Sequence, residues 1–254
     1  MIDNERFLDV LHDAGVNFFS GVPDSYLNGF CNCLLENVPD EHNVIAANEG
    51  NAVAIASAHY FSTGGVPLVY MQNSGIGNAI NPLMSLADRS VYGVPIVLLI
   101  GWRGEPGTGD HAQHEVQGEL TTRLLDLMSI PFVVAEDDNE LLEKQVRPLI
   151  LQAQRERKVV AIVARKGVFA SEKKSTEPIE NGYPLFREEA IEVVLDAMPR
   201  DTLYVATTGR ATRELYFLRE KRGEGHDWDF LNVGSMGHAS SVAVSLALTN
   251  RARK

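Results

Sequence analysis

Short, unbroken apolar segments recur along this chain of 254 residues, and stretches with helical periodicity separate them. The segments lie at 17–20, 43–47, 67–72, 94–101, 131–135 and 159–164. They are continuous and rich in β-branched residues, which is typical of strands buried on both faces of a parallel sheet. We therefore expect an α/β fold, a parallel sheet with helices on both faces. Right-handed crossovers would then place the strand carboxyl ends and their loops along one edge.

A polar, charged stretch interrupts this pattern at 166–184, and we interpret it as a linker. It would separate a first domain, residues 1–165, from the start of a second α/β domain, residues 185–254. After it we expect helices over 187–197 and 210–222 and from 237 onward, with strands over 203–206 and 230–233. Two parallel strands cannot cover both faces of an open sheet. The sequence therefore predicts that the second domain is incomplete within these residues.

Charge and cysteine content exclude several classes of protein. The formal charge is −11, and no Lys/Arg cluster stands out, which argues against nucleic acid or an anionic membrane as a partner. Cys31 and Cys33 lie one residue apart and form no disulfide framework, so a reducing compartment is indicated. No segment reaches the roughly 20 apolar residues of a membrane span, and the N-terminus lacks the basic region of a signal peptide. We expect a cytoplasmic protein.

Two acidic residues follow predicted strands. Asp24, in GVPDS (21–25), is either a proton carrier or the N-cap of a helix over 26–36. Glu49 precedes a helix of mostly small residues, where it is either a carboxylate favoured by the helix dipole or a catalytic group. A carboxylate shielded from water at that position would have a raised pKa and could exchange protons near neutral pH.

Three glycine-rich loops also follow predicted strands. QNSGIGNAINPL (72–83) suits close approach of the backbone to a ligand, although it is neither a Walker loop nor GxGxxG. The long loop 101–118 contains His111 and His114, which are either a general acid or anion-binding pair or ordinary surface histidines. We favour both over metal binding, because no further His or Cys completes a ligand set. The turn in 232–243 either holds a phosphate oxygen with backbone N–H groups or packs a strand tightly on a helix.

Together these segments resemble the thiamine diphosphate-dependent decarboxylases, and within them the group that acts on 3-phosphonopyruvate or 3-sulfopyruvate. The matching strings are GVPDS, NEGNAVAIA, QNSGIGNAINPL, GWRGEPG, AQHEVQG, TTGRATREL and NVGSMGHASS. They follow the family's order over nearly the whole chain. The resemblance implies a pyrimidine-binding first domain and the beginning of a diphosphate-binding second domain. It also implies a lyase of phosphonate metabolism.

The resemblance assigns roles to individual residues. Glu49 would protonate the aminopyrimidine ring of thiamine diphosphate, so that the thiamine diphosphate ylid forms and decarboxylates 3-phosphonopyruvate to phosphonoacetaldehyde and CO2. Asp24 and His114 would serve the later proton transfers and place the substrate. The other implied contacts are Asn73 and Gly75 at the cofactor, Arg103, His111 and His114 at the substrate, and Gly234, Ser235, Met236, Gly237 and His238 at the cofactor from the second domain. Arg103 is equally well interpreted as an ordinary surface arginine.

The resemblance further implies Mg²⁺ and a homodimer or larger oligomer with the active site at the subunit interface. The family's GDG…N segment, which binds Mg²⁺, is expected beyond residue 254, and no metal ligand is assigned within the chain. The string from Asp110 to His114 departs from the family's DEPQH, which bears on the substrate contacts. The alternatives are a sulfopyruvate decarboxylase, because a sulfonate is a similar tetrahedral oxyanion, and a catalytically incomplete subunit or fragment.

Overall fold

The computed structural model describes residues 1–170 and 182–249, and its contacts divide the chain into two units, Met1–Lys174 and Ser175–Lys254. The linker expected at 166–184 falls largely on residues 171–181, which lie outside the described residues. The domain boundaries therefore remain a prediction.

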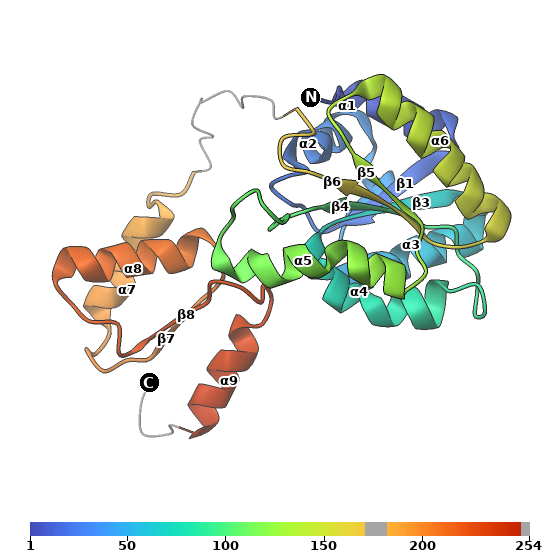
Figure 1. The fold of residues 1–254 in the computed structure, drawn as a ribbon. Coiled ribbons are helices and arrows are strands. Elements are labelled where there is room, and N and C mark those ends of the chain that lie inside the picture. The colour runs from blue at the N-terminus through green and yellow to red at the C-terminus, as the bar shows by residue number, and fades with distance from the viewer. Residues whose placement is uncertain (171–181, 250–254) are drawn as a thin grey trace. The chain divides into compact units, whose positions relative to one another are not determined.

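The N-terminal unit is built on a six-stranded sheet in the order β2-β1-β3-β4-β6-β5, with every neighbouring pair parallel (Figure 1). The strands are β1 (Val16–Gly21), β2 (Asn43–Ile45), β3 (Val66–Gln72), β4 (Val97–Gly101), β5 (Phe132–Ala135) and β6 (Val160–Ala164). All the predicted strands of this unit are present, so the parallel α/β fold is confirmed. The strand predicted over 43–47 is shorter than expected: only Asn43–Ile45 pair with β1.

Helices cover both faces of this sheet, as Figure 1 shows. Neighbouring strand residues belong to different cores: Leu68 and Tyr70 face one, and Val69 and Met71 the other. The first core contains side chains of α1 (Asn4–Asp13), α2 (Asn28–Asn37) and α6 (Asn139–Glu156). The second contains side chains of α3 (Glu49–Thr63), α4 (Ile76–Pro82) and α5 (Ala112–Leu127). This two-sided burial explains why the strand segments are apolar throughout.

Local capping signals set several helix ends. The Asp3 side chain accepts a hydrogen bond from the Arg6 N–H at the start of α1, and Asn48 accepts one from Asn51 N–H at the start of α3. α3 ends at Gly64, whose φ of 75° is the left-handed conformation that glycine adopts without a Cβ clash.

Two sequence predictions about helix starts are wrong. The helix expected from residue 26 begins at Asn28, and its N-cap is Leu27, with no side-chain cap. Asp24 is therefore not its N-cap; its Oδ2 accepts a hydrogen bond from Tyr26 N–H, which forms a turn before the helix. The loop expected over 101–118 ends at His111, because α5 begins at Ala112 and buries Gly118.

The C-terminal unit contains α7 (Arg187–Ala197), β7 (Tyr204–Ala206), α8 (Arg210–Arg222), β8 (Asp229–Leu231) and α9 (Ala239–Thr249). The parallel pair β7–β8 packs on a small core around Leu195, Leu215 and Leu218. Helices α7 and α8 agree with the sequence prediction at both ends. Among the described residues, no helix is long and apolar enough to cross a lipid bilayer.

Candidate functional site

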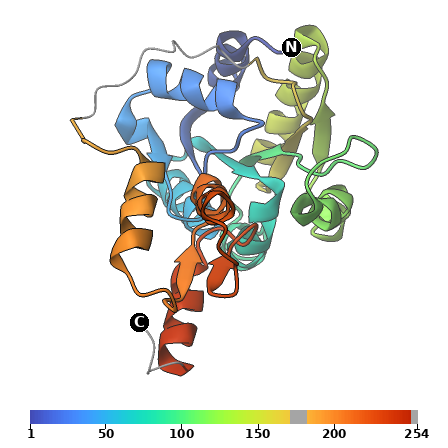
Figure 2. The ribbon, with the colours of Figure 1, turned by 90° about the vertical axis from the view of Figure 1, so that its left-hand side faces the viewer.

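The carboxyl ends of β1, β3, β4 and β6 lie at one edge of the sheet of the N-terminal unit, because all the strands are parallel. Each is followed by a loop that carries polar side chains. The loop between β4 and α5 projects beside α5 in Figure 2. This edge holds the candidate site residues that the sequence places between Asp24 and His114.

Glu49 is the first residue of α3 and is only 5% exposed. Its Oε2 atom accepts a hydrogen bond of 2.8 Å from Asn78 Nδ2 in α4. Within the described residues its Oε1 atom has no hydrogen-bond partner, and no cation pairs with the carboxylate. A buried carboxylate with one oxygen held and one open is arranged to bond a further group.

Gly75 makes this arrangement of Glu49 sterically feasible. Gly75 ends the short helical turn η2 (Asn73–Gly75), and a Cβ at this position would lie 2.3 Å from Glu49 Cγ and 2.5 Å from Oε1. Any larger residue would therefore push the carboxylate away. The predicted contact of Gly75 with a cofactor remains a prediction, but its packing against Glu49 is direct.

Asp24 is 6% exposed and is held by β3 and β4. Gln72 Nε2 donates a hydrogen bond of 2.7 Å to Asp24 Oδ1, and Ser74 Oγ donates one of 2.7 Å to Gln72 Oε1. A Cβ at Gly101 would lie 2.1 Å from Asp24 Oδ2. The orientation of the Asp24 carboxylate is therefore fixed by two successive side-chain hydrogen bonds, from Ser74 to Gln72 and from Gln72 to Asp24.

The Asn73 side chain connects three parts of the edge. Its Nδ2 atom donates to the Arg103 carbonyl at 2.8 Å and to Thr121 Oγ1 of α5 at 2.9 Å, and its Oδ1 accepts from Arg103 N–H at 3.2 Å. Both polar atoms of the Asn73 amide are therefore hydrogen-bonded within the protein, and these bonds fasten the start of the 102–111 loop. A contact of Asn73 with a cofactor stays a prediction.

Arg103 is bound to its own loop. Its Nε and Nη2 atoms donate to Asp110 Oδ2 and Oδ1 at 2.7 and 2.6 Å, and its guanidinium carbon lies 4.8 Å from the centroid of the Tyr26 ring. Hydrogen bonds from Arg103, and then from the backbone of His111 and Gly104, hold the pKa of Asp110 well below its usual range. Arg103 is thus a partly buried group that is ion-paired within its own loop. Its contact with a substrate stays a prediction.

The two histidines of the predicted site lie on either side of the α5 start. His111 is the exposed N-cap residue of α5, and His114 is half-buried in the first turn. Burial, followed by the nearby Arg103 charge, lowers the pKa of His114 below its ordinary value. The His114 ring is therefore neutral near pH 7, where its lone pair can accept a proton. No group of three or more metal-binding side chains occurs among the described residues.

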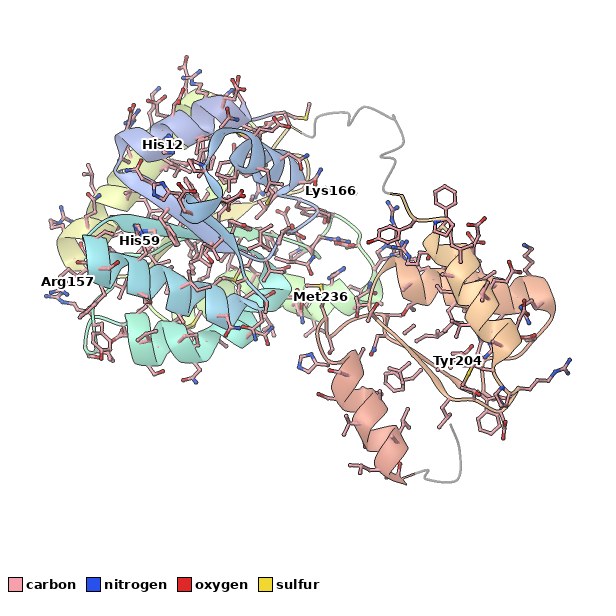
Figure 3. The ribbon with its side chains drawn as sticks, turned by 180° about the vertical axis from the view of Figure 1, so that it is seen from behind. His12, His59, Arg157, Lys166, Tyr204 and Met236 are labelled. Atoms are coloured by element: carbon pink, nitrogen blue, oxygen red, sulfur yellow. The ribbon has the colours of Figure 1, made fainter. Side chains whose placement is uncertain are left out.

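In the C-terminal unit, residues 234–238 form the turn between β8 and α9. Ser235 and Gly237 have φ values of 52° and 89°, and Thr208 Oγ1 donates to the Gly234 carbonyl at 2.7 Å. Ser235, Met236, Gly237 and His238 are exposed; Figure 3 labels Met236. The positive φ of Ser235 is uncommon for a residue with a side chain.

The sequence did not single out Gln72, Asn78, Tyr26 or Asp110 as site residues on their own. Gln72 and Asn78 fall within the glycine-rich string 72–83, and Asp110 within the loop 101–118, so their loops carried a signal. Which of their atoms meet Glu49, Asp24 or Arg103 depends on contacts between separate segments of the chain.

Comparison with known proteins identifies the class. The model of the thiamine pyrophosphate enzyme N-terminal TPP-binding domain matches residues 4–126. The α subunit of sulfopyruvate decarboxylase from Methanococcus maripaludis is 30% identical over 54% of this chain and 79% of that relative. The chain belongs to the thiamine pyrophosphate-dependent decarboxylase family.

Within that family, several relatives match over nearly the whole chain. A sulfopyruvate decarboxylase from Methanosarcina acetivorans is 25% identical over 96% of this chain and 65% of the relative. A phosphonopyruvate decarboxylase from Streptomyces viridochromogenes is 31% identical over 94% of this chain and 61% of the relative. Another from Streptomyces hygroscopicus is 30% identical over 98% of this chain and 63% of the relative. The chain thus spans about three fifths of the length of these two relatives.

Proposed function

We propose that this protein catalyses the non-oxidative decarboxylation of 3-phosphonopyruvate to phosphonoacetaldehyde and CO2, with thiamine diphosphate as cofactor. The observation that carries the proposal is the buried Glu49 carboxylate, with Oε2 fixed by Asn78 and Oε1 open. It lies in a chain similar to two phosphonopyruvate decarboxylases over nearly its whole length.

The Glu49 site fits the pyrimidine ring of thiamine diphosphate. An open carboxylate oxygen, shielded from water, can hold a proton shared with a ring nitrogen. When bound, thiamine diphosphate supplies a thiazolium ring that accepts the electron pair released as CO2 leaves. In the proposal, Glu49 exchanges the proton at that ring nitrogen, and Asn78 keeps the carboxylate oriented toward it.

Asp24 and His114 are proposed to transfer protons at the substrate. Gln72 holds the Asp24 carboxylate in one orientation, and burial keeps the His114 ring neutral. A neutral imidazole accepts a proton through its lone pair, and it gives up its N–H proton only to a strong base. The protonation state of the His114 ring therefore decides whether it accepts or donates a proton. Arg103 and His111 are proposed to recognise the oxyanion group of the substrate.

Residues 234–238 are proposed to contact the diphosphate. They precede α9, and backbone N–H groups at a helix start attract phosphate oxygens. Mg²⁺ is part of the proposed holoenzyme. The described residues contain no cluster that fits it, and the proposal therefore assigns the metal to none of them and derives no step through it.

We further propose a homodimer or larger oligomer that works in the cytoplasm, with the active site at the subunit interface. Large apolar side chains such as Phe61 and Leu127 are about four-fifths exposed on the chain by itself, which supports association with another surface. Cys31 is a buried thiol outside any disulfide, which supports a reducing compartment.

Sulfopyruvate decarboxylation is the second candidate, because the Methanococcus maripaludis α subunit is also a relative. A sulfopyruvate decarboxylase from Methanosarcina acetivorans also matches over 96% of this chain, so coverage does not separate the two substrates. Its identity is 25%, against 31% and 30% for the Streptomyces phosphonopyruvate decarboxylases, and this difference in identity favours the phosphonate as substrate.

The test is a side-by-side assay of CO2 release from 3-phosphonopyruvate and 3-sulfopyruvate by the protein supplied with thiamine diphosphate and Mg²⁺. We expect phosphonoacetaldehyde and CO2 in equal amounts, with the higher kcat/KM for the phosphonate. A higher kcat/KM for the sulfonate would move the assignment to the second candidate. No release from either substrate by protein that demonstrably binds the cofactor would contradict both.

A further inference from the structure

Hydrogen-bond donors from several positions converge on the Asp110 carboxylate. Arg103 donates through Nε at 2.7 Å and Nη2 at 2.6 Å, and the backbone N–H groups of Gly104 and His111 donate at 3.0 and 2.7 Å. Tyr26 Oη adds a bond of 3.3 Å to Asp110 Oδ2. We call these donors the Asp110 cradle. A guanidinium fork with converging backbone N–H groups is a recurrent arrangement for binding anions.

The Asp110 cradle opens onto a surface hollow of about 460 Å³. Its lining includes His111 and Lys166. Lys166 follows β6 and is labelled in Figure 3. Among the described residues neither side chain has an ion-pair or hydrogen-bond partner. Asp110 is the only carboxylate among the described residues that line the hollow. The hollow therefore offers positive charge beyond what Asp110 neutralises.

The loop that carries Asp110 has glycines at its turns. Gly104, Gly107 and Gly109 have φ values of 68°, 82° and 65°, and the space around the last two is open. Apart from the Asp110 cradle and the Asn73 bonds at its start, the loop is fastened by Glu105, whose carboxylate lies 2.8 Å from Arg165 Nε and whose carbonyl accepts bonds from Thr108. Release of Asp110 from the cradle would therefore free the segment 106–110 without breaking the Glu105 anchor.

We propose that the Asp110 cradle is the oxyanion site of this protein, and that Asp110 occupies it as an internal ligand that a tetrahedral phosphonate or sulfonate displaces. Naming the phosphonate or sulfonate rests on the proposed function; the anion site rests on the geometry alone. A phosphonate presents two oxygens to the guanidinium fork as a carboxylate does, and its third oxygen and higher charge can engage His111 and Lys166.

This exchange of ligands has an energetic basis. Leaving the partly buried Arg103 without an anion would be costly, so Asp110 can leave only as another anion arrives. Because the two anions compete, the affinity measured for the external anion is reduced by the fraction of molecules in which Asp110 occupies the cradle. The internal ligand thereby keeps Arg103 from binding anions that are too weak to displace Asp110.

The first test measures binding of methylphosphonate and methanesulfonate by calorimetry at constant ionic strength, with no cofactor present. Asp110→Asn keeps the size of the side chain but removes its charge, and we expect roughly tenfold tighter binding of methylphosphonate. Glu105→Gln is the matched control, because it removes the other ion pair of the same loop, and it should leave the affinity unchanged. Arg103→Lys should abolish binding, because lysine lacks the bidentate fork.

The second test needs no variant. Hydrogen exchange of the backbone amides of Gly107, Thr108 and Gly109 should become faster when methylphosphonate is added to the unchanged protein. Unchanged or weaker anion binding by folded Asp110→Asn, or unchanged exchange in this segment at saturating methylphosphonate, would overturn the proposal. Tighter binding of methanesulfonate than of methylphosphonate would support the oxyanion site and transfer the substrate assignment to the sulfonate.

These outcomes are separate from those of the decarboxylase assay. An enzyme that releases CO2 from 3-phosphonopyruvate but shows neither effect would retain its function and lose the exchangeable ligand. A protein that shows both effects but decarboxylates neither substrate would retain the anion site and lose the proposed reaction.

Discussion

Asn78 Nδ2 lies 2.8 Å from Glu49 Oε2 and donates a hydrogen bond to it, which ties the start of α4 to the start of α3. Gly75, three residues before Asn78, packs directly against the Glu49 side chain. One short segment of the chain therefore both orients the buried carboxylate and leaves room for it. The remaining oxygen of Glu49 is the atom on which the proposed cofactor chemistry depends.

Replacement of Glu49 by Gln should reduce turnover by about 10²–10⁴-fold, because an amide cannot exchange a proton with the cofactor ring. Gln retains an oxygen that can accept the Asn78 hydrogen bond, and the free energy of unfolding should change little. The measurement is kcat with saturating cofactor, together with a denaturant melt of the same preparation. Near-normal turnover in a folded variant would remove Glu49 from the mechanism.

Gly75→Ala should destabilise the protein by about 1–3 kcal/mol, because the new methyl group would overlap the Glu49 side chain. Gly77→Ala, two residues further on in α4, is the matched control. A Cβ at Gly77 meets nothing within 4 Å, so this variant should be as stable as the unchanged protein or up to about 1 kcal/mol more stable. Chemical denaturation of both variants checks the prediction, and equal stabilities would contradict the tight packing.

Asn73→Ala should lower the free energy of unfolding by about 2–3 kcal/mol, because it leaves the buried Arg103 backbone and Thr121 hydroxyl without their amide partner. Asn81→Ala, which removes an exposed amide bonded to Ser85, should change stability by less than about 0.5 kcal/mol. If Asn73→Ala instead unfolds like the unchanged protein but fails to bind thiamine diphosphate, the side chain acts mainly as a cofactor ligand.

Acidification should destabilise the protein partly through His114. Its pKa in the folded state is below the ordinary value because burial disfavours the charged ring. The unfolded chain therefore binds the proton more tightly, so the contribution of His114 to stability is complete above about pH 6.5 and is lost as the pH falls through the folded-state pKa. His114→Gln should reduce the difference in denaturation midpoint between about pH 7.5 and pH 5.

His59 provides the control for that experiment. Burial, and then the charge of His42, also lowers the pKa of His59, so His59→Gln should flatten the same pH dependence of stability. Only His114→Gln should also lower kcat or raise KM, since His59 lies away from the candidate site and stacks on Phe18. An equal loss of turnover in both variants would indicate that the His114 effect is structural.

The sequence by itself determined the parallel α/β fold and the position of the candidate residues along the chain. Short unbroken apolar segments are typical of strands that are covered on both faces. Helical periodicity predicted the first and last residues of α7 and α8 correctly. Because parallel strands end at one edge, Asp24, Glu49, Asn73 and Arg103 could be assigned to that neighbourhood before any coordinate was known. The local sequence is sufficient for these conclusions, because the buried face of each helix or strand is recorded in the spacing of apolar residues within that segment.

Only the tertiary structure decided which atoms these residues meet. Gln72 contacts Asp24 because β3 lies beside β1, and Arg103 pairs with Asp110 because the loop folds back before α5. The starts of α2, at Asn28, and of α5, at Ala112, also differ from the sequence prediction. Hydrogen-bond partners distant in sequence are selected by strand order and loop closure, which leave no periodic signal in the sequence. The pattern of residues therefore located the site, and the packing of separate segments determined its chemistry.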